Sequence, residues 1–171
     1  PEKCALICDA TSRSYGELAG RVRHVCGGVA AYGIRKGERV AVLAPNCVEY
    51  PELVVGLSDA GAIVVTLNPR STAHEITAAC NDCSARLLFV HPSLAGTAFA
   101  ATFASVERII VLGEEYEAWL AEAPESAPLE DIDETDPFTL VYSSGTTGRP
   151  KGIVISHRSR ALTFHGMAME Y

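Results

Sequence analysis

The chain has 171 residues, 48% of them hydrophobic, so it can bury a sizeable core and is sized for one domain or slightly more. Its longest apolar run, residues 60–67, is too short to span a bilayer, and no signal segment opens the sequence, which predicts a cytoplasmic location. The net charge is −7 and no basic stripe carries interleaved aromatic residues, which argues against nucleic acid as a partner.

A short hairpin and a long helix are predicted at the start of the chain. Residues 5–9 are expected to pair with the segment that follows them. Ser14 and Glu17 have the spacing of a capping box, so a helix should begin there. Apolar residues then recur at helical spacing up to Gly33, which suits the left-handed end of a helix. His24 falls on the polar side of this helix, where solvent is its simplest partner.

Strands and helices are expected to alternate from Arg39 to Leu112. The predicted strands cover residues 39–44, 62–67, 86–90 and 108–112. Three helices are predicted between them. The first begins at Asn46 or Cys47, the second begins at another capping box formed by Thr72 and Glu75, and the third covers residues 93–104. Because the connections usually contain a helix, this alternation predicts an α/β fold with a largely parallel sheet.

Six cysteines would suit three disulfides, but a chain without a secretory signal is expected to keep them reduced. Cys80 and Cys83 form a C-x-x-C pair, for which redox or zinc chemistry is the functional alternative. With Ile76 and Ala79, however, they fall at i, i+3, i+4 and i+7, the spacing of a buried helical face. We therefore predict that both thiols are core residues, and we assign no metal-binding residues.

The acidic residues are concentrated in one stretch. Ten of the 21 acids lie between Glu114 and Asp136, with no Lys or Arg among them. Residues 114–120 are predicted as a short helix, and residues 121–137, which hold several prolines, as an exposed connector. Magnesium binding by these carboxylates is the alternative to a solvated acidic loop. The predicted organisation is an α/β layer over 1–120, an acidic connector over 121–137, and a hairpin with a following helix over 138–171.

The most chemically specific stretch lies near the end of the chain. Apolar runs at residues 138–142 and 153–155 flank residues that are almost all glycine, hydroxyl or cation, which predicts a strand, a loop and a second strand. Glycines let backbone N–H groups approach an anion, hydroxyls add donors, and Lys151 adds positive charge. A polyphosphate is therefore the expected ligand, and an ordinary glycine-rich hairpin is the alternative. The predicted binding residues are Ser143, Ser144, Gly145, Thr146, Thr147, Gly148 and Lys151.

Two common nucleotide-binding patterns do not occur in the sequence. Counting from Gly145 places Pro150 where the Walker loop needs its second glycine, and Gly152 where it needs a hydroxyl. There is also no G-x-G-x-x-G, the dinucleotide-binding fingerprint.

Residues 142–152, followed by Ser156-His157-Arg158, closely resemble the phosphate-loop signature of the adenylate-forming (AMP-binding) enzymes. This superfamily includes acyl- and aryl-CoA synthetases, nonribosomal peptide adenylation domains and firefly-type luciferases. Ser143 stands where Thr is commoner, which keeps the hydroxyl. Earlier segments resemble the N-terminal half of acyl-CoA synthetases in order and spacing, although Thr66 replaces the usual proline of that branch. These segments are Ser14-Tyr15-x-Glu17-Leu18, residues 37–42, Pro45-Asn46, residues 60–62 and Leu67-Asn68-Pro69-Arg70.

The resemblance implies an ATP-dependent, AMP-forming acid–thiol ligase. The carboxylate of a small-molecule acid, fatty or aromatic, would attack the α-phosphorus of ATP, and the acyl adenylate would then form a thioester with CoA. The loop would hold the β- and γ-phosphates together with Mg²⁺. Lys151 would be the catalytic residue that offsets the developing negative charge.

The resemblance also implies that the chain is an N-terminal fragment of such an enzyme. Most of the acyl pocket, the adenine contacts and the mobile C-terminal domain would lie beyond it. We therefore expect the isolated chain to be inactive, and to expose apolar surface through which it self-associates. Two alternatives stay open: an adenylation domain that loads a carrier protein, and a non-catalytic nucleotide- or polyphosphate-binding module.

Overall fold

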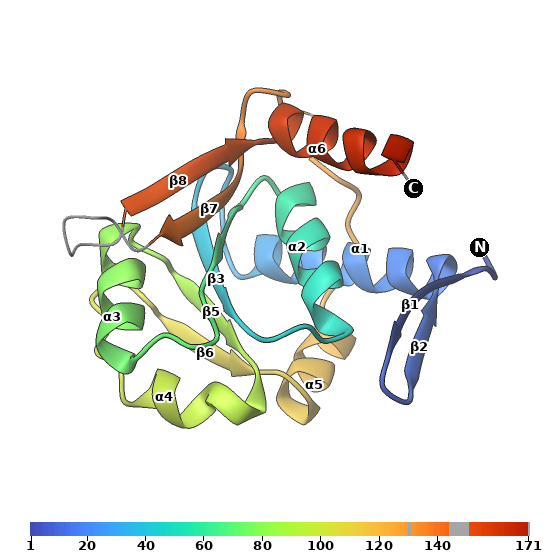
Figure 1. Ribbon diagram of the computed structural model, residues 1–171. Helices are drawn as coiled ribbons and strands as arrows, with labels where there is room; N and C mark the ends of the chain where they lie inside the picture. Colours follow the sequence, from blue (N-terminus) through green and yellow to red (C-terminus); the bar gives the residue numbers. More distant parts are fainter. Residues whose placement is uncertain (130, 144–150, 171) are drawn as a thin grey trace.

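The computed structural model describes residues 1–129, 131–143 and 151–170. A two-stranded hairpin precedes a six-stranded sheet that has helices on both faces (Figure 1). The strands are β1 (Cys4–Cys8), β2 (Thr11–Ser14), β3 (Arg39–Leu43), β4 (Ile63–Thr66), β5 (Leu87–Val90), β6 (Arg108–Val111), β7 (Pro137–Ser143) and β8 (Lys151–Ser156). The helices are α1 (Tyr15–Ala31), α2 (Glu49–Asp59), α3 (Ala73–Asp82), α4 (Ala95–Phe99), α5 (Glu114–Glu122) and α6 (His157–Glu170).

The large sheet has the strand order β6-β5-β3-β4-β7-β8. Every neighbouring pair is parallel except β7 and β8, which run antiparallel at one edge. The predicted α/β fold with a largely parallel sheet is therefore confirmed. The antiparallel pair at the edge corresponds to the strand, loop and strand predicted near the end of the chain.

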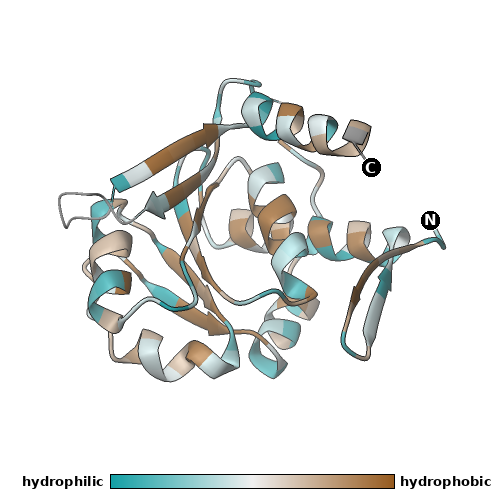
Figure 2. Ribbon diagram, viewed as in Figure 1, coloured by the Kyte–Doolittle hydropathy of each residue, from teal (hydrophilic) through white to brown (hydrophobic). Residues whose placement is uncertain are grey.

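The central strands of the sheet are buried on both faces, and β3 shows this residue by residue. Val40 and Val42 pack in a core formed with α1, α2 and α5, whereas Ala41 and Leu43 pack in a second core with α3. Side chains alternate between the two faces of a strand, so a strand covered on both sides must be apolar throughout. Figure 2 shows this as brown strands inside the helical layers.

Helix boundaries follow the sequence signals closely at two positions. Ser14 and Thr72 each accept a hydrogen bond from the backbone N–H three residues later, and Glu17 and Glu75 return the bond to the cap, so both predicted capping boxes are confirmed. Gly33 has a φ of 89°, as the end of α1 requires. Helix α2 begins at Glu49, slightly later than predicted.

The helix predicted over residues 93–104 is shorter in the structure. It consists of a 3₁₀ turn at Pro92–Leu94 and α4 at Ala95–Phe99. Beyond α4, the backbone N–H groups bond to side chains of α3: Thr102 N–H donates to Thr77 Oγ1 at 3.0 Å, and Ala104 N–H to Asn81 Oδ1 at 2.8 Å. These donors are satisfied outside a helix, so the helix ends early.

The acidic connector packs more closely against the body than its composition indicates. A Cβ added to Gly27 of α1 would lie 1.8 Å from the carbonyl oxygen of Pro124, so only glycine admits this contact. Leu129 N–H donates to the carbonyl of Asp59 at 2.7 Å. His24, expected in solvent, has Nδ1 2.8 Å from the carbonyl oxygen of Ala123, and this correction follows from the same packing.

The described part of the chain contains no helix that is both long and apolar enough to cross a membrane.

Candidate functional site

The hairpin of β7 and β8 holds the two ends of the predicted phosphate loop. In its antiparallel register Tyr142 faces Gly152, and Ser143 faces Lys151. Ser143 and Lys151 are exposed and directly opposite each other, at the end of the hairpin where β7 leaves for the connecting residues and β8 begins. The other predicted binding residues lie outside the described residues: Ser144, Gly145, Thr146, Thr147 and Gly148.

The sheet places this hairpin end at an edge where ligands commonly bind. Strand β7 is parallel to β4, with Thr66 opposite Val141, so both strands point their carboxyl ends toward the same edge. Strand β4 leads there into the turn at residues 67–71, in which Arg70 N–H donates to Asn68 Oδ1 at 2.9 Å. In open α/β sheets, ligands bind outside the carboxyl ends of the strands.

Tyr142 ties the hairpin to helix α3. Its hydroxyl donates to Asp82 Oδ2 at 2.6 Å, and a Cβ added to Gly152 would lie 3.4 Å from the Cζ of its ring. Burial, together with the hydrogen-bonded Asp82 carboxylate, raises the pKa of the Tyr142 phenol above its ordinary value. Sequence reasoning identified Tyr142 as part of the signature but missed Asp82, because nothing in the pattern of α3 marks it as a partner.

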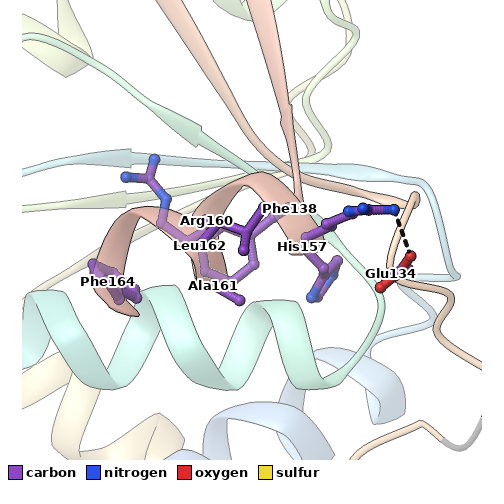
Figure 3. Close-up of a pocket in the computed structure, with 8 residues that line it drawn as sticks. Glu134, Phe138, His157, Arg160, Ala161, Leu162 and Phe164 are labelled. Atoms are coloured by element: carbon purple, nitrogen blue, oxygen red, sulfur yellow. Dashed lines mark hydrogen bonds and ion pairs between the residues drawn. The ribbon is translucent and has the colours of Figure 1, made fainter. Parts of the chain in front are cut away.

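A hollow of about 610 Å³ lies at the opposite end of β7 (Figure 3). The rings of Phe138 and His157 meet edge to face with centroids 5.0 Å apart. The guanidinium of Arg160 lies 5.8 Å from the centroid of Phe138 and 5.7 Å from that of Phe164. Phe138 lies near the start of β7, whereas Ser143 ends that strand, and among the described residues neither Ser143 nor Lys151 lines this hollow.

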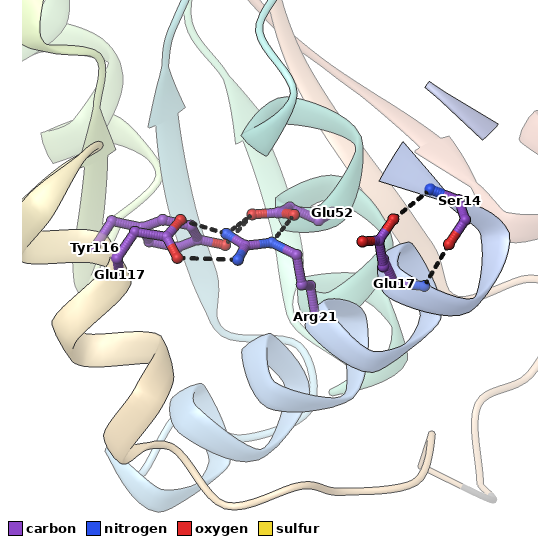
Figure 4. A network of polar contacts seen from close by, with 6 residues as sticks. All are labelled: Ser14, Glu17, Arg21, Glu52, Tyr116 and Glu117. Atoms are coloured by element: carbon purple, nitrogen blue, oxygen red, sulfur yellow. Dashed lines mark hydrogen bonds and ion pairs between the residues drawn. The ribbon is translucent and has the colours of Figure 1, made fainter. Parts of the chain in front are cut away.

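A buried acid–base network joins α1, α2 and α5 (Figure 4). The Glu52 carboxylate is fully buried and accepts from Arg21 Nε at 2.5 Å, Arg21 Nη2 at 2.8 Å and the Tyr116 hydroxyl at 2.8 Å. Arg21 also donates to both oxygens of Glu117, at 3.0 and 2.6 Å. Both Glu52 oxygens are already bonded, so the arrangement indicates a structural role. Sequence reasoning did not predict it.

Cys80 and Cys83 are buried in the core beneath α3, as the helical spacing predicted. Burial raises the pKa of the Cys80 thiol to about 12, and the pKa of the Cys83 thiol is also raised by burial. Both thiols therefore stay protonated at neutral pH, a state in which they are poor nucleophiles.

The fold and the motif together define a class of protein. A mostly parallel sheet, with an edge hairpin that carries the signature of residues 142–152, is the architecture of the N-terminal domain of an adenylate-forming enzyme. The sequence matches the AMP-binding enzyme family from residue 1 to residue 171, and the chain belongs to that family.

Individual relatives agree with this membership. The chain is 32% identical over 160 residues to a fatty acid–[acyl-carrier-protein] ligase, ScoC, from Streptomyces coeruleorubidus, covering 93% of this chain and 31% of ScoC. It is 35% identical over 157 residues to a feruloyl-CoA synthase from an Amycolatopsis species, covering 92% of this chain and 31% of the synthase. Its fold matches the crystal structure of the anthranilate CoA ligase AuaEII in complex with anthranoyl-AMP. That match has a TM-score of 0.88 and 28% identity, and covers 94% of this chain and 33% of AuaEII.

The chain therefore spans about a third of the length of the curated relatives it matches.

Proposed function

We propose that this chain is the N-terminal part of an ATP-dependent, AMP-forming acid–thiol ligase, and that its β7–β8 hairpin binds the β- and γ-phosphates of MgATP. The observation that carries this proposal is the position of the signature. Residues 142–152 begin and end on two paired strands at the carboxyl edge of the sheet. The reaction would join a carboxylate to AMP with release of pyrophosphate, and would then pass the acyl group to CoA.

The described ends of the loop support phosphate binding by their chemistry. Ser143 offers a rotatable hydroxyl donor, and Lys151 a mobile positive charge directly across the hairpin. Transfer at phosphorus is accelerated mainly by positioning and by charge that meets the developing negative charge. Lys151 would bind the phosphate oxygens and stabilise the departing pyrophosphate, while Ser143 would help to orient it. Binding of Mg²⁺ within MgATP would neutralise further phosphate charge.

A carrier protein in place of CoA is the second candidate acceptor. ScoC is described as a ligase for an acyl-carrier protein, whereas the feruloyl-CoA synthase and AuaEII are CoA ligases. All three match this chain over more than nine-tenths of its length, so the shared part leaves the acceptor open. Assay of the intact protein with CoA and with a phosphopantetheinylated carrier protein, each with the same acid, would distinguish the two.

Carboxylate-dependent exchange of labelled pyrophosphate into ATP tests the proposal. We expect the intact protein to catalyse this exchange with fatty or aromatic acids, and residues 1–171 alone to give no rate above background. Among the described residues, the hairpin supplies phosphate-binding groups, and we propose that the adenine and carboxylate contacts come from the remainder of the enzyme. If residues 1–171 alone catalyse the exchange, the proposal that the remainder of the enzyme supplies the adenine and carboxylate contacts is contradicted. If the intact protein catalyses no exchange with any acid, the proposed function is contradicted.

The exposed apolar side chains of β8 and α6 are expected to pack against the rest of the enzyme. Large apolar side chains are exposed on β8, the edge strand of the sheet, and on α6, which follows it. Figure 2 shows β8 as a mostly brown strand. An exposed apolar patch of this kind is typical of an interface. The residues are Ile153, Val154, Leu162, Phe164, Met167 and Met169, each more than half exposed.

The isolated chain should therefore self-associate. We expect light scattering coupled to gel filtration to show a mass that rises with concentration for residues 1–171. Replacing Leu162 and Phe164 by glutamate should shift the chain toward monomer, whereas the same change at Ser12 and Thr97 should not. A monodisperse monomer of the unmodified chain at high concentration would contradict this expectation.

A further inference from the structure

The hydroxyl of Tyr142 bonds to the end of α3, and Tyr142 lies directly before Ser143, the first residue of the predicted phosphate loop. Tyr142 is the penultimate residue of β7, and Asp82 is the last residue of α3. Their side chains meet at 2.6 Å although the residues are 60 positions apart in the sequence. Ser143, the first predicted phosphate-binding residue, follows directly, so a shift of Tyr142 moves the base of the loop.

The ring of Tyr142 also contacts the second strand of the hairpin. A Cβ on Gly152 would lie 3.0 Å from Leu140 Cδ1 and 3.4 Å from Tyr142 Cζ, tighter than or at the limit of an ordinary contact. Because glycine has no Cβ, position 152 leaves room for the side chains of Leu140 and Tyr142. Gly152 directly follows Lys151, the second described residue of the predicted site. The side chain of Tyr142 thus bonds to α3 and occupies the space beside Gly152 of β8, next to both described ends of the loop.

The hydrogen bond from Tyr142 stabilises a negative charge that stands at an unfavourable position on helix α3. Asp82 lies at the carboxyl end of α3, where the helix dipole disfavours an anion. A phenol that donates a short hydrogen bond to this carboxylate offsets that cost, and bonds to charged acceptors are stronger than neutral ones. The half-buried ring and the exposed carboxylate thus form a specific contact that packing alone does not require.

We propose that the Tyr142–Asp82 hydrogen bond is a positioning contact that holds the β7–β8 hairpin against α3, and so places Ser143 and Lys151 for binding the phosphates of ATP. This inference rests on the proposed function. Tyr142 acts through its neighbours and touches no reacting atom. Asp82, which contributes nothing to the signature itself, becomes a determinant of nucleotide affinity.

The kinetic test uses Tyr142→Phe in the intact protein, which removes the hydroxyl and keeps the ring over Gly152. We expect the KM for MgATP in pyrophosphate exchange to rise about fivefold to tenfold, which is the effect of losing one hydrogen bond of ordinary net strength. The KM for the carboxylate should not change. Asp82→Ala should give the same rise, the double variant no further rise, and Asp82→Asn a smaller one. Tyr15→Phe, which changes an exposed tyrosine on α1, should match the unmodified protein.

A second measurement does not depend on activity. Amide hydrogen exchange over residues 141–143 and 151–153 should be roughly fivefold to tenfold faster in Tyr142→Phe than in Tyr15→Phe, because the hairpin end opens more often. The thermal midpoint of the two variants should agree, since the core is untouched. Unchanged exchange at these amides, or an unchanged KM for MgATP, would overturn the inference.

The two proposals fail in different ways. If the intact protein shows no carboxylate-dependent exchange, the proposed function fails, and the role in ATP binding fails with it. If the protein is active and Lys151→Ala impairs it while Tyr142→Phe and Asp82→Ala do not, the function stands and the positioning contact is overturned.

Discussion

Replacing Lys151 by alanine is expected to lower the rate of carboxylate-dependent pyrophosphate exchange in the intact protein by about a hundredfold. Removal of one preorganised group that meets developing charge typically costs that much, or about 2.7 kcal/mol of barrier. Lys151 stands across the hairpin from Ser143 with its side chain exposed, so it is free to reach a bound phosphate. Pyrophosphate exchange measures the first half-reaction alone, which keeps the result independent of the thiol acceptor.

Matched variants distinguish the effect of removing Lys151 from the general effect of removing one positive charge. Lys3→Ala removes one positive charge from the exposed N-terminal segment and should leave exchange unchanged. Lys151→Arg keeps the charge but replaces a compact ammonium with a planar fork, so an intermediate loss is expected. Gly145→Val places a β-branched residue in the loop itself, outside the described residues, and should also impair exchange. Unchanged exchange in both Lys151→Ala and Gly145→Val would contradict the assignment of the phosphate loop.

The sequence predicted the location of the candidate site, because its chemistry is carried by consecutive residues. Glycines, hydroxyls and Lys151 between two apolar runs indicate a loop between strands, and the structure pairs those strands with Ser143 opposite Lys151. Asp82 could not be found in the same way. It belongs to a helix whose pattern records only which face is buried, and its contact with Tyr142 depends on how that helix packs on the sheet.

The elements of the fold were also predictable, but their order in the sheet was not. Apolar runs and capping boxes identify strands and helices because both signals act over a few residues. The central position of β3, between β4 and β5, depends on packing between distant segments. The shortened α4 has a similar cause: Thr77 and Asn81 of α3 take backbone donors that a continuing helix would have used.

The buried network around Glu52 was likewise not predictable from the sequence, because it joins distant segments. Glu52 sits in a helix that reads as apolar on most sides, and its partners Arg21 and Tyr116 are 31 and 64 positions away. Burial opposes the charge on Arg21, but hydrogen bonds to Glu52 and Glu117 outweigh it and hold its pKa above the ordinary value. Burial, with the Glu52 carboxylate beside it, raises the pKa of the Tyr116 phenol well above its usual range.

Replacing Glu52 by alanine is therefore expected to lower the free energy of unfolding by about 3 to 5 kcal/mol, because it takes the acceptor from the buried Tyr116 hydroxyl and the buried partner from the Arg21 guanidinium, which keeps the half-exposed Glu117. Against a typical stability of about 5 to 15 kcal/mol, such a loss is large.

Glu117→Ala removes a half-exposed partner of the same Arg21 and should cost about 1 kcal/mol or less. Glu52→Gln keeps the shape and one acceptor, and should fall between the two. Urea denaturation followed by tryptophan fluorescence would measure all three, since Trp119 stacks on Tyr116 with ring centroids 5.9 Å apart. If Glu52→Ala and Glu117→Ala lower the free energy of unfolding equally, the prediction is contradicted, because the buried Glu52 carboxylate would then stabilise the fold no more than the half-exposed Glu117 does.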